Sequence, residues 1–277
     1  MKLYKYHGAG NDFLIIDQRQ EAQELTKHDI IHLCDRHTGF GSDGLMTVGQ
    51  GEGQAAFKMQ FFNPDGTSGM MCGNGGRCIS AFVAQSGEFK DKHFLFQAPD
   101  GIHESWIVQN DPATHTQIVR LKMADVTEVK SYGDSCYFIN TGARHFVCPV
   151  DDVDRTDVVA HGRAYRYHDP RFQPEGVNVD FVHPEADGLL QVRTYEKGVE
   201  DETLACGTGI VATALAAHLM GVKPESTEGL SVTYAVQARI SRLTVEFEPV
   251  PHAESGTPAF RNIYLTGPAT LVGEIEV

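Results

Sequence analysis

Residues 204–221, "LACGTGIVATALAAHLMG", place a cysteine and two glycines directly before a run that is apolar on nearly every side. A helix with such a pattern is normally buried all round. Residues 71–78, "MCGNGGRC", have the same form and lead into a shorter apolar segment, residues 79–84. We therefore expect two enclosed helices, each beginning beside a cysteine.

The rest of the chain is typical of short strands. Several segments alternate apolar and polar residues, as at Leu243, Val245 and Phe247, which favours half-buried antiparallel strands. A third helix is predicted from Thr26, a plausible N-cap. Examples of the expected strands are residues 3–8, 12–17, 58–63, 93–99, 102–108, 117–123, 136–140, 145–150, 190–196, 242–249 and 262–277. The pattern predicts an α/β (α+β) fold with two mostly antiparallel sheets, each curled around one helix.

Matched spacings indicate an internal repeat. Phe13 lies 59 residues before Cys72, and Phe146 lies 60 residues before Cys206. Two more pairs of residues lie at nearly equal distances before their cysteines. Asp43 precedes Cys72 by 29 residues and Asn178 precedes Cys206 by 28. Asn63 precedes Cys72 by 9 residues and Glu196 precedes Cys206 by 10. We expect one domain at 1–112 plus the strand 262–277, and a second at 113–261, joined by the polar segment 110–115.

Bulk composition narrows the class of protein. The net charge of -14 over 277 residues argues against a broad nucleic-acid surface, which needs clustered Lys and Arg. No apolar run reaches the 18 residues that span a bilayer, and the N-terminus lacks a signal-peptide core. We expect a cytoplasmic protein with six reduced cysteines and no membrane or nucleic-acid partner.

Two of the cysteines are candidates for chemistry. A helix N-terminus stabilises a thiolate and a bound carboxylate, and glycine allows close approach of a ligand, so Cys72 and Cys206 are predicted to be functional. Cys78 follows Cys72 at a spacing that suits no zinc knuckle and is expected to pack inside its helix. The others, Cys34, Cys136 and Cys148, are interpreted as inert buried residues.

Other patterns are weaker. Residues 39–44 match the dinucleotide pattern G-x-G-x-x-G, but no strand precedes them and no good helix follows. His28 and His32 have the spacing of helical metal ligands without the glutamate of a metalloprotease, so a solvated helix face is expected. The sequence predicts no cofactor and no metal.

Two symmetry-related cysteines suit inversion at a stereocentre. A thiolate on one face of a carbon removes a proton while a thiol on the other face donates one, and the two exchange roles with direction. The competing hypothesis is a redox pair, although the spacing is not C-x-x-C. Apart from that hypothesis, a disulfide between Cys72 and Cys206 on air oxidation is expected as a route of inactivation.

Together these motifs resemble the diaminopimelate epimerase family, over the whole chain. They are "HGAGNDF" at 7–13, "DGL" at 43–45, "FNPDGT" at 62–67, "CGNGGRC" at 72–78, "VN" at 177–178, "RTYEKGVEDETLACGTG" at 193–209 and "LTGPA" at 265–269. The resemblance implies two pseudo-symmetric domains, each a β-barrel-like sheet around a central helix, with the active site in the cleft between them. It also implies interconversion of LL- and meso-diaminopimelate without a cofactor, in lysine and cell-wall biosynthesis, by a homodimer.

The same resemblance assigns roles. Cys72 and Cys206 match the acid/base pair, and His145 and Glu196 match residues that tune the thiols. Asn11, Asn63 and Asn178 match substrate-binding asparagines. The helix-start residues that hold the reacting carboxylate are matched by Gly73, Asn74, Gly207 and Thr208, and Glu196 and Lys197 stand at a further substrate contact.

Two segments depart from the family pattern, at Lys197 and at Ala143–Arg144. Lys197 replaces the usual arginine and loses the fork that grips a carboxylate through two bonds. Ala143 and Arg144 stand where the family has Asn or Ser followed by Pro, which removes a polar contact and adds a positive charge. These changes bear on the substrate's distal end. The alternatives are therefore an epimerase or racemase of another amino acid, a non-catalytic amino-acid-binding protein or a thiol redox sensor.

Overall fold

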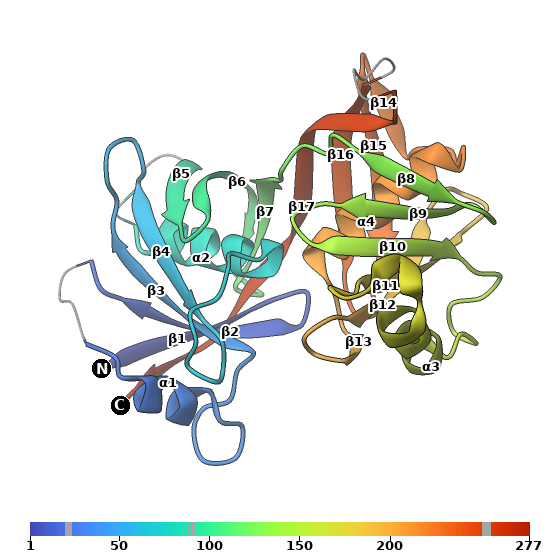
Figure 1. Ribbon diagram of the computed structural model, residues 1–277. Helices are drawn as coiled ribbons and strands as arrows, with labels where there is room; N and C mark the ends of the chain where they lie inside the picture. Colours follow the sequence, from blue (N-terminus) through green and yellow to red (C-terminus); the bar gives the residue numbers. More distant parts are fainter. Residues whose placement is uncertain (20–23, 88, 90–91, 251–255) are drawn as a thin grey trace. The chain divides into compact units, whose positions relative to one another are not determined.

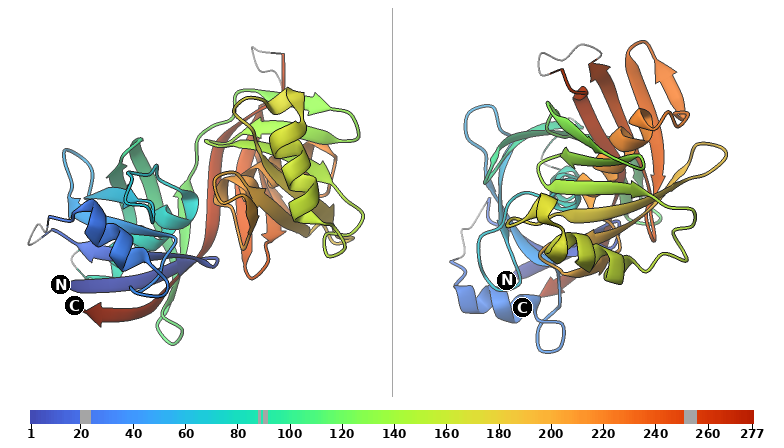
Figure 2. Two further views of the ribbon diagram at one scale, coloured as in Figure 1. Left: turned by 60° about the horizontal axis from the view of Figure 1, so that its bottom comes forward. Right: turned by 45° about the vertical axis from the view of Figure 1, so that its right-hand side comes forward.

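The computed structural model describes residues 1–19, 24–87, 89, 92–250 and 256–277. The chain divides into two compact units, Met1–Leu121 with Gly267–Val277, and Lys122–Thr266. Each unit consists of strands that surround one central helix, and Figures 1 and 2 show both units. The predicted α/β architecture with two enclosed helices is confirmed.

Unit 1 is a closed barrel of eight strands. Each strand is paired with the next in the order β1, β2, β3, β4, β5, β6, β7, β17, and β17 pairs back with β1. Its elements are β1 (Lys2–Gly8), β2 (Asn11–Asp17), α1 (Lys27–Cys34), β3 (Gly44–Gln50), β4 (Phe57–Phe62), α2 (Gly73–Gln85), β5 (His93–Ala98), β6 (Gly101–Asp111) and β7 (Thr116–Lys122). Among the described residues of this unit, only β2–β3 and β4–β5 are parallel pairs, and the crossovers that parallel strands require carry α1 and α2.

Unit 2 repeats this plan. The strand order is β8, β9, β10, β11, β12, β15, β16, β17, and the single bridge Val126↔Phe260 joins the segment before β8 to β17. Its elements are β8 (Val129–Tyr132), β9 (Cys136–Asn140), β10 (Arg144–Pro149), α3 (Val158–Arg163), a π-helical turn (Ala164–His168), a 3-10 turn (Pro170–Phe172), β11 (Asn178–Pro184), β12 (Leu190–Glu196), β13 (Asp201–Thr203), α4 (Gly207–Leu219), β14 (Ser226–Glu228), β15 (Ser231–Gln237), β16 (Arg242–Val250) and β17 (Ala259–Glu276). The parallel pairs β10–β11 and β12–β15 are again the ones with helical crossovers, α3 and α4.

The repeat therefore extends to strand direction. Strands β1 to β6 correspond in order to β9, β10, β11, β12, β15 and β16, and α2 corresponds to α4. Phe13 of β2 and Phe146 of β10 occupy equivalent places, as their spacing predicted.

The central helices explain the unusual composition of the two cysteine stretches. Eleven residues of α2 and ten of α4 are buried. Helix α2 packs against β1, β2, β3 and β6, and α4 packs against β9, β10, β11, β12, β15 and β16. An apolar surface all round suits these positions, because each helix faces barrel wall on every side.

Strand β17, drawn in red in Figure 1, contributes to both units. Its first part pairs with β16 in unit 2, and its second part pairs with β7 and β1 in unit 1. The segment 110–115, expected to be a linker, instead belongs to the β6–β7 hairpin: Asn110 and Asp111 end β6, and residues 112–115 form the turn. Hairpin turns and linkers share the same polar composition, so the division lies later than expected, after Leu121 and after Thr266.

Candidate active site

Cys72 is the N-cap of α2. Its Sγ accepts the N–H of Gly75 at 3.2 Å, an arrangement that stabilises negative charge on sulfur at the positive end of the helix. The side chain is half-buried. A Cβ on Gly75 would come within 3.4 Å of this sulfur and 3.2 Å of Met46 Sδ, so the glycine allows the helix start to lie close to the barrel wall.

A buried guanidinium supports the start of α2. Arg77 has no exposed surface, and it donates to the Gly73 carbonyl at 3.1 Å and to Asn74 Oδ1 at 2.8 Å. Burial lowers the pKa of Arg77, while the charges of Cys78 and Cys72 oppose that change. The positive charge of Arg77 therefore favours the thiolate form of Cys72.

The expected residues of unit 1 are partly brought together. Asn74 Nδ2 donates to Asn11 Oδ1 at 3.3 Å, which places both amides at the start of α2 with Cys72 and Gly73. Asn63 follows β4, and its amide donates to Thr67 Oγ1 at 3.0 Å within the 63–67 turn.

Cys206 is the N-cap of α4, the equivalent position in unit 2. Its Sγ lies 3.5 Å from Thr208 Oγ1. Burial raises the pKa of the Cys206 thiol well above its ordinary value, and the negative charges of Glu196 and Asp180 raise it further. Cys206 therefore holds its proton at neutral pH.

A chain of hydrogen bonds extends from this thiol into the core. His145 Nε2 lies 2.9 Å from Thr208 Oγ1, and His145 Nδ1 lies 2.7 Å from Asp180 Oδ2. Thr194 Oγ1 donates to the other Asp180 oxygen at 2.7 Å. Both His145 and Asp180 are fully buried, so the imidazole is fixed in one orientation.

Asp180 and Arg77 are site residues without an assigned role in the sequence interpretation. Asp180 lies two residues after Asn178 on β11, where the alternation of a strand turns its side chain to the same face. The signal that could have found it is a charged residue inside an apolar strand, because a buried charge needs a partner.

The other expected residues of unit 2 lie around the same strand ends. Asn178 pairs with His145 in register, donates to the Arg144 carbonyl at 2.8 Å and accepts the Lys197 N–H at 2.8 Å. Glu196 accepts a hydrogen bond from Thr203 Oγ1 at 2.9 Å. Gly207 is buried in the first turn of α4.

The two departures from the family pattern have different surroundings. Arg144 forms an ion pair with Glu175 at 2.8 Å, and its guanidinium lies 5.4 Å from the centre of the Phe138 ring. Its charge is therefore compensated within the protein. The side chain of Lys197 is exposed.

The remaining cysteines differ from one another. Cys34 and Cys78 are buried as expected, and burial raises the pKa of each thiol. Cys136 was expected to be buried, and this expectation is wrong, because the residue is only half-buried at the start of β9. Cys148 is buried, as expected. The cysteine spacing could not show that β9 and β10 place these two side by side.

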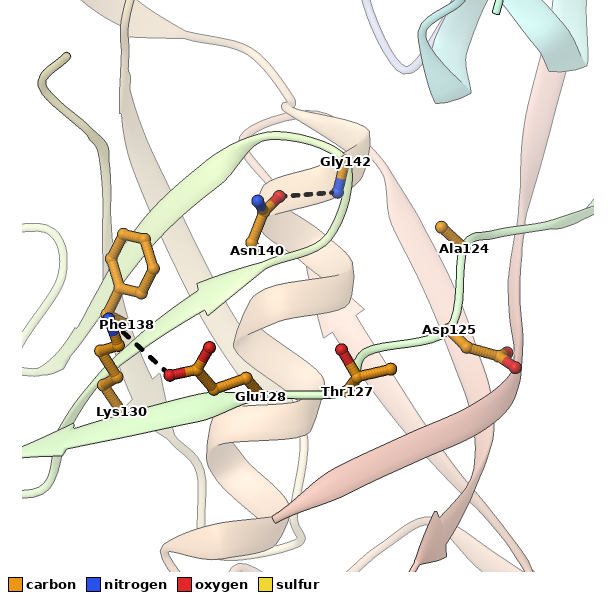
Figure 3. A pocket seen from close by; sticks show the side chains of 8 residues that line it. All are labelled: Ala124, Asp125, Thr127, Glu128, Lys130, Phe138, Asn140 and Gly142. Carbon is orange, nitrogen blue, oxygen red and sulfur yellow. Dashed lines mark hydrogen bonds and ion pairs between the residues drawn. The ribbon is translucent and has the colours of Figure 1, made fainter. Parts of the chain in front are cut away.

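A hollow of about 370 Å³ lies elsewhere on unit 2, at the β9–β10 turn and the segment before β8 (Figure 3). Its lining consists of Ala124, Asp125, Thr127, Glu128, Lys130, Phe138, Asn140 and Gly142. None of the expected site residues is among them. Asn140 accepts the Gly142 N–H at 3.1 Å, and Glu128 and Lys130 form an ion pair at 3.7 Å.

The two weaker sequence patterns, residues 39–44 and the pair His28 and His32, lie outside the candidate site. Residues 39–43 lie in the connection from α1 to β3, and a strand follows them. His28 and His32 are exposed on α1.

Among the helices of the described residues, none has the length and apolar content needed to cross a bilayer. Nor do three or more His, Cys, Asp or Glu side chains gather as a metal-ligand set anywhere in the described ranges.

Comparison with known proteins now decides the family. The family model for diaminopimelate epimerase matches residues 3–127 and 137–246. The chain belongs to the diaminopimelate epimerase family. It is 40% identical to the diaminopimelate epimerase of Flavobacterium psychrophilum, with both chains fully covered. It is 35% identical to that of a Hydrogenobaculum species, over 99% of this chain and 97% of the relative.

Solved structures share the fold of this epimerase family at lower identity. A probable proline racemase from Agrobacterium radiobacter matches with a TM-score of 0.70 at 17% identity, over 100% of this chain and 92% of that one. A PhzF-family phenazine biosynthesis protein from Bacillus anthracis matches with a TM-score of 0.74 at 15% identity, over 100% and 98%.

Proposed function

We propose that this protein is a diaminopimelate epimerase that inverts the α-carbon with two thiols and no cofactor. The observation that carries the proposal is the pair of cysteines at equivalent N-caps, Cys72 on α2 and Cys206 on α4. Their surroundings have opposite charge, with Arg77 beside one, and Glu196 and Asp180 beside the other. Two-base inversion needs one deprotonated and one protonated group, and these surroundings favour that division.

The proton transfers follow from this asymmetry. The Cys72 thiolate removes the α-proton from one face of the substrate carbon, and the Cys206 thiol donates its proton to the other face. In the reverse direction the two thiols exchange roles. Negative charge on Cys206 after donation is accommodated by hydrogen bonds from Thr208 and the Gly209 N–H.

The helix starts supply the carboxylate site. The first N–H groups of a helix have no acceptor within it and lie at the positive end of the dipole. We assign Gly73, Asn74, Gly207 and Thr208 to the reacting carboxylate. Negative charge that develops on this carboxylate during proton removal is stabilised there.

We assign the remaining substrate contacts to Asn11, Asn63, Asn178, Glu196 and Lys197. Asn178 uses its Oδ1 and one N–H within the protein, and a primary amide carries a second N–H that can donate to substrate. A positioning role is assigned to His145 and to its partner Asp180. We further propose a cytoplasmic homodimer, on the family resemblance alone.

The first test is proton exchange. Reduced protein with LL-diaminopimelate in deuterated buffer, without pyridoxal phosphate, is expected to yield meso product and to incorporate solvent deuterium at the α-carbon. Cys72→Ser and Cys206→Ser are each expected to lose about 100-fold or more in turnover, since each removes one acid/base group. Cys34→Ser is the control, with turnover unchanged.

Retention of full epimerisation by either single variant would contradict the two-thiol mechanism. Absence of both exchange and meso product in the wild-type protein would overturn the assignment of substrate. A panel of other amino acids then tests the alternative of a related racemase, to which Lys197 and Ala143 bear directly.

A further inference from the structure

Cys136 and Cys148 face each other across the β9–β10 hairpin. Tyr137 pairs with Val147 in this antiparallel ladder, so the next opposed positions are Cys136 and Cys148. Directly opposed residues of antiparallel strands point to the same face, with Cβ atoms about 4.5–5.5 Å apart. The two Sγ atoms lie 2.9 Å apart.

The two thiols have unequal access to solvent. Cys136 is half-buried at the first position of β9. Cys148 is buried in a cluster that includes Phe146, Phe172 and Val179. A diffusing oxidant therefore reaches Cys136 first, with Cys148 directly behind it.

Their proton affinities differ in the same sense. The hydrogen bond between the two Sγ atoms lowers the pKa of the Cys136 thiol, against opposing effects of burial and of the Asp134 charge. The same hydrogen bond and burial raise the pKa of Cys148. The positive charge of Arg171 favours the thiolate of either residue. Cys136 is thus the thiol of the pair that deprotonates more readily, and an accessible thiol of this kind beside a second cysteine is the usual arrangement of a redox-sensitive pair.

We propose that Cys136 and Cys148 form a peroxide-oxidisable dithiol, separate from the two helix-capping thiols, in which Cys136 reacts first and Cys148 resolves. A small hydroperoxide is the oxidant. The site does not take part in the proposed epimerisation.

The chemistry balances in two steps. The Cys136 sulfur attacks one oxygen of the peroxide, the O–O bond breaks, and Cys136 becomes a sulfenic acid while one water leaves after protonation. Cys148 sulfur then attacks the Cys136 sulfur, forms the S–S bond and expels the sulfenic oxygen as a second water. The net reaction converts two thiols and hydrogen peroxide to one disulfide and two water molecules.

The geometry needs little change for this bond. A disulfide requires sulfur atoms about 2.05 Å apart and Cβ atoms about 3.5–4.5 Å apart, so the sulfurs close by less than 1 Å. Both residues are already on paired strands, and no loop has to reorganise.

The test uses full-length wild-type protein treated with hydrogen peroxide, then alkylated and digested with trypsin without reduction. Arg144 lies between the two cysteines, and cleavage after Lys130, Arg144 and Arg155 gives peptides 131–144 and 145–155. We expect these two peptides joined and two hydrogens lighter than their sum. Prior reduction is expected to release both. Cys72, Cys78 and Cys206 lie on other tryptic peptides, so their oxidation is recorded separately.

Single variants test the order of reaction. With Cys148→Ser, sulfenic acid is expected to accumulate on Cys136 and to be trapped by a cyclic 1,3-diketone. With Cys136→Ser, oxidation of Cys148 is expected to slow by about tenfold or more, because the accessible thiolate is lost. Cys34→Ser, a buried thiol of unit 1, is the control and should leave the joined peptides unchanged.

Two outcomes would overturn the proposal. One is failure of the joined 131–144 and 145–155 peptides to form while Cys72 or Cys206 is oxidised. The other is sulfenic acid on Cys148 in the Cys136→Ser protein at the wild-type rate of Cys136, which would reverse the roles. Neither outcome depends on epimerase activity.

Discussion

At the scale of single residues, the two helix-capping cysteines differ in their charged neighbours. Arg77 is the fifth residue of α2, the helix that Cys72 caps. Asp180 and Glu196 reach Cys206 from β11 and β12. Equivalent backbone positions thus have charged neighbours of opposite sign, which favour the thiolate form at Cys72 and the protonated thiol at Cys206.

The charge beside Cys206 predicts the behaviour of a Glu196→Gln variant. The carboxylate raises the pKa of the Cys206 thiol, so its removal lowers that pKa and increases the thiolate fraction at a given pH. The pH profile for alkylation of Cys206 is expected to move to lower pH by roughly 0.5–1 unit, since a partly screened charge is worth about 1 kcal/mol. Iodoacetamide labelling measured by mass spectrometry provides the readout.

Glu228→Gln, which removes an exposed carboxylate of β14, is the matched control and should leave the Cys206 profile in place. If the pH dependence of Cys206 alkylation in the Glu196→Gln protein is unchanged or moves to higher pH, Glu196 does not raise the pKa of this thiol.

Asp180 predicts a different kinetic signature. Asp180→Asn keeps an oxygen near His145 but removes the charge that fixes the imidazole tautomer. We expect kcat to fall about 10- to 100-fold with KM nearly unchanged. This loss is smaller than the roughly 10⁴-fold loss in kcat on replacing the aspartate of a Ser-His-Asp catalytic triad, because His145 acts through Thr208. Steady-state kinetics across pH measure both values. A rise in KM with kcat unchanged would instead indicate a role in substrate binding.

At the scale of elements, the glycines at the helix starts serve packing as well as substrate access. A Cβ on Gly209 would lie 2.4 Å from Asp180 Oδ1 and 3.1 Å from His145 Cε1. The first turn of α4 can therefore approach β10 and β11 only with glycine at this position.

Gly209→Ala is therefore expected to destabilise unit 2 by about 1–3 kcal/mol, the range for overpacking in a well-packed core. Chemical denaturation measures the loss, and turnover should fall because Asp180 and His145 are displaced. Gly133→Ala is the control, since a Cβ there meets nothing within 4 Å, and its effect should stay within about 0.5 kcal/mol. Equal stability of the two variants would argue against the close approach.

Local signals explain which elements could be predicted. Thr26 caps α1 with a full capping box, and both cysteine stretches begin helices, because caps and apolar runs are written in consecutive residues. Strands β3, β8, β11, β13, β14 and β15 and helix α3 were not individually predicted, since short segments do not distinguish strand from helix.

Non-local contacts explain what could not be predicted. The segment 110–115 belongs to a hairpin because β6 and β7 pair, whereas its polar composition alone is equally typical of a linker. The partnership of Asp180 with His145 depends on parallel pairing of β10 and β11. Cys136 and Cys148 meet only through the register of β9 and β10. The roles of the site residues stay predictions until the variants are measured.

At the scale of the whole molecule, each repeat completes the barrel of the other. The chain leaves unit 1 after β7, bridges to β17 at Val126↔Phe260 and then forms β8, which pairs with β9 at the other edge of unit 2. It leaves unit 2 within β17, and the second part of that strand closes unit 1 between β7 and β1. The two closing strands are thus exchanged between repeats.

This exchange predicts the result of cutting the chain at the β8–β9 turn, after Gly133. Fragment 1–133 lacks the strand that closes its barrel, and fragment 134–277 lacks β8, so each exposes unpaired strand edges. We expect neither fragment alone to show cooperative unfolding, whereas co-refolded fragments form a 1:1 complex with turnover. Size-exclusion chromatography and thermal melts measure this.

Removal of residues 267–277 from the intact chain is the companion variant. It should expose unit 1 to limited proteolysis and leave unit 2 protected, because the β16–β17 pairing lies before residue 267. Cooperative unfolding of the isolated 1–133 fragment would contradict the role of β17 in unit 1.

The exchanged strands also bear on ancestry. A gene for one repeat, about half this length, would encode seven strands of one barrel and an eighth that fits only a second copy. Such a protein is a homodimer joined by swapped strands, and domain swapping is a low-cost route to dimers. Duplication and fusion of that gene would produce this chain with its pairings unchanged. The fused copies could then diverge, and a substitution such as the aspartate of β11 could make one thiol unlike the other, which two identical subunits could never do.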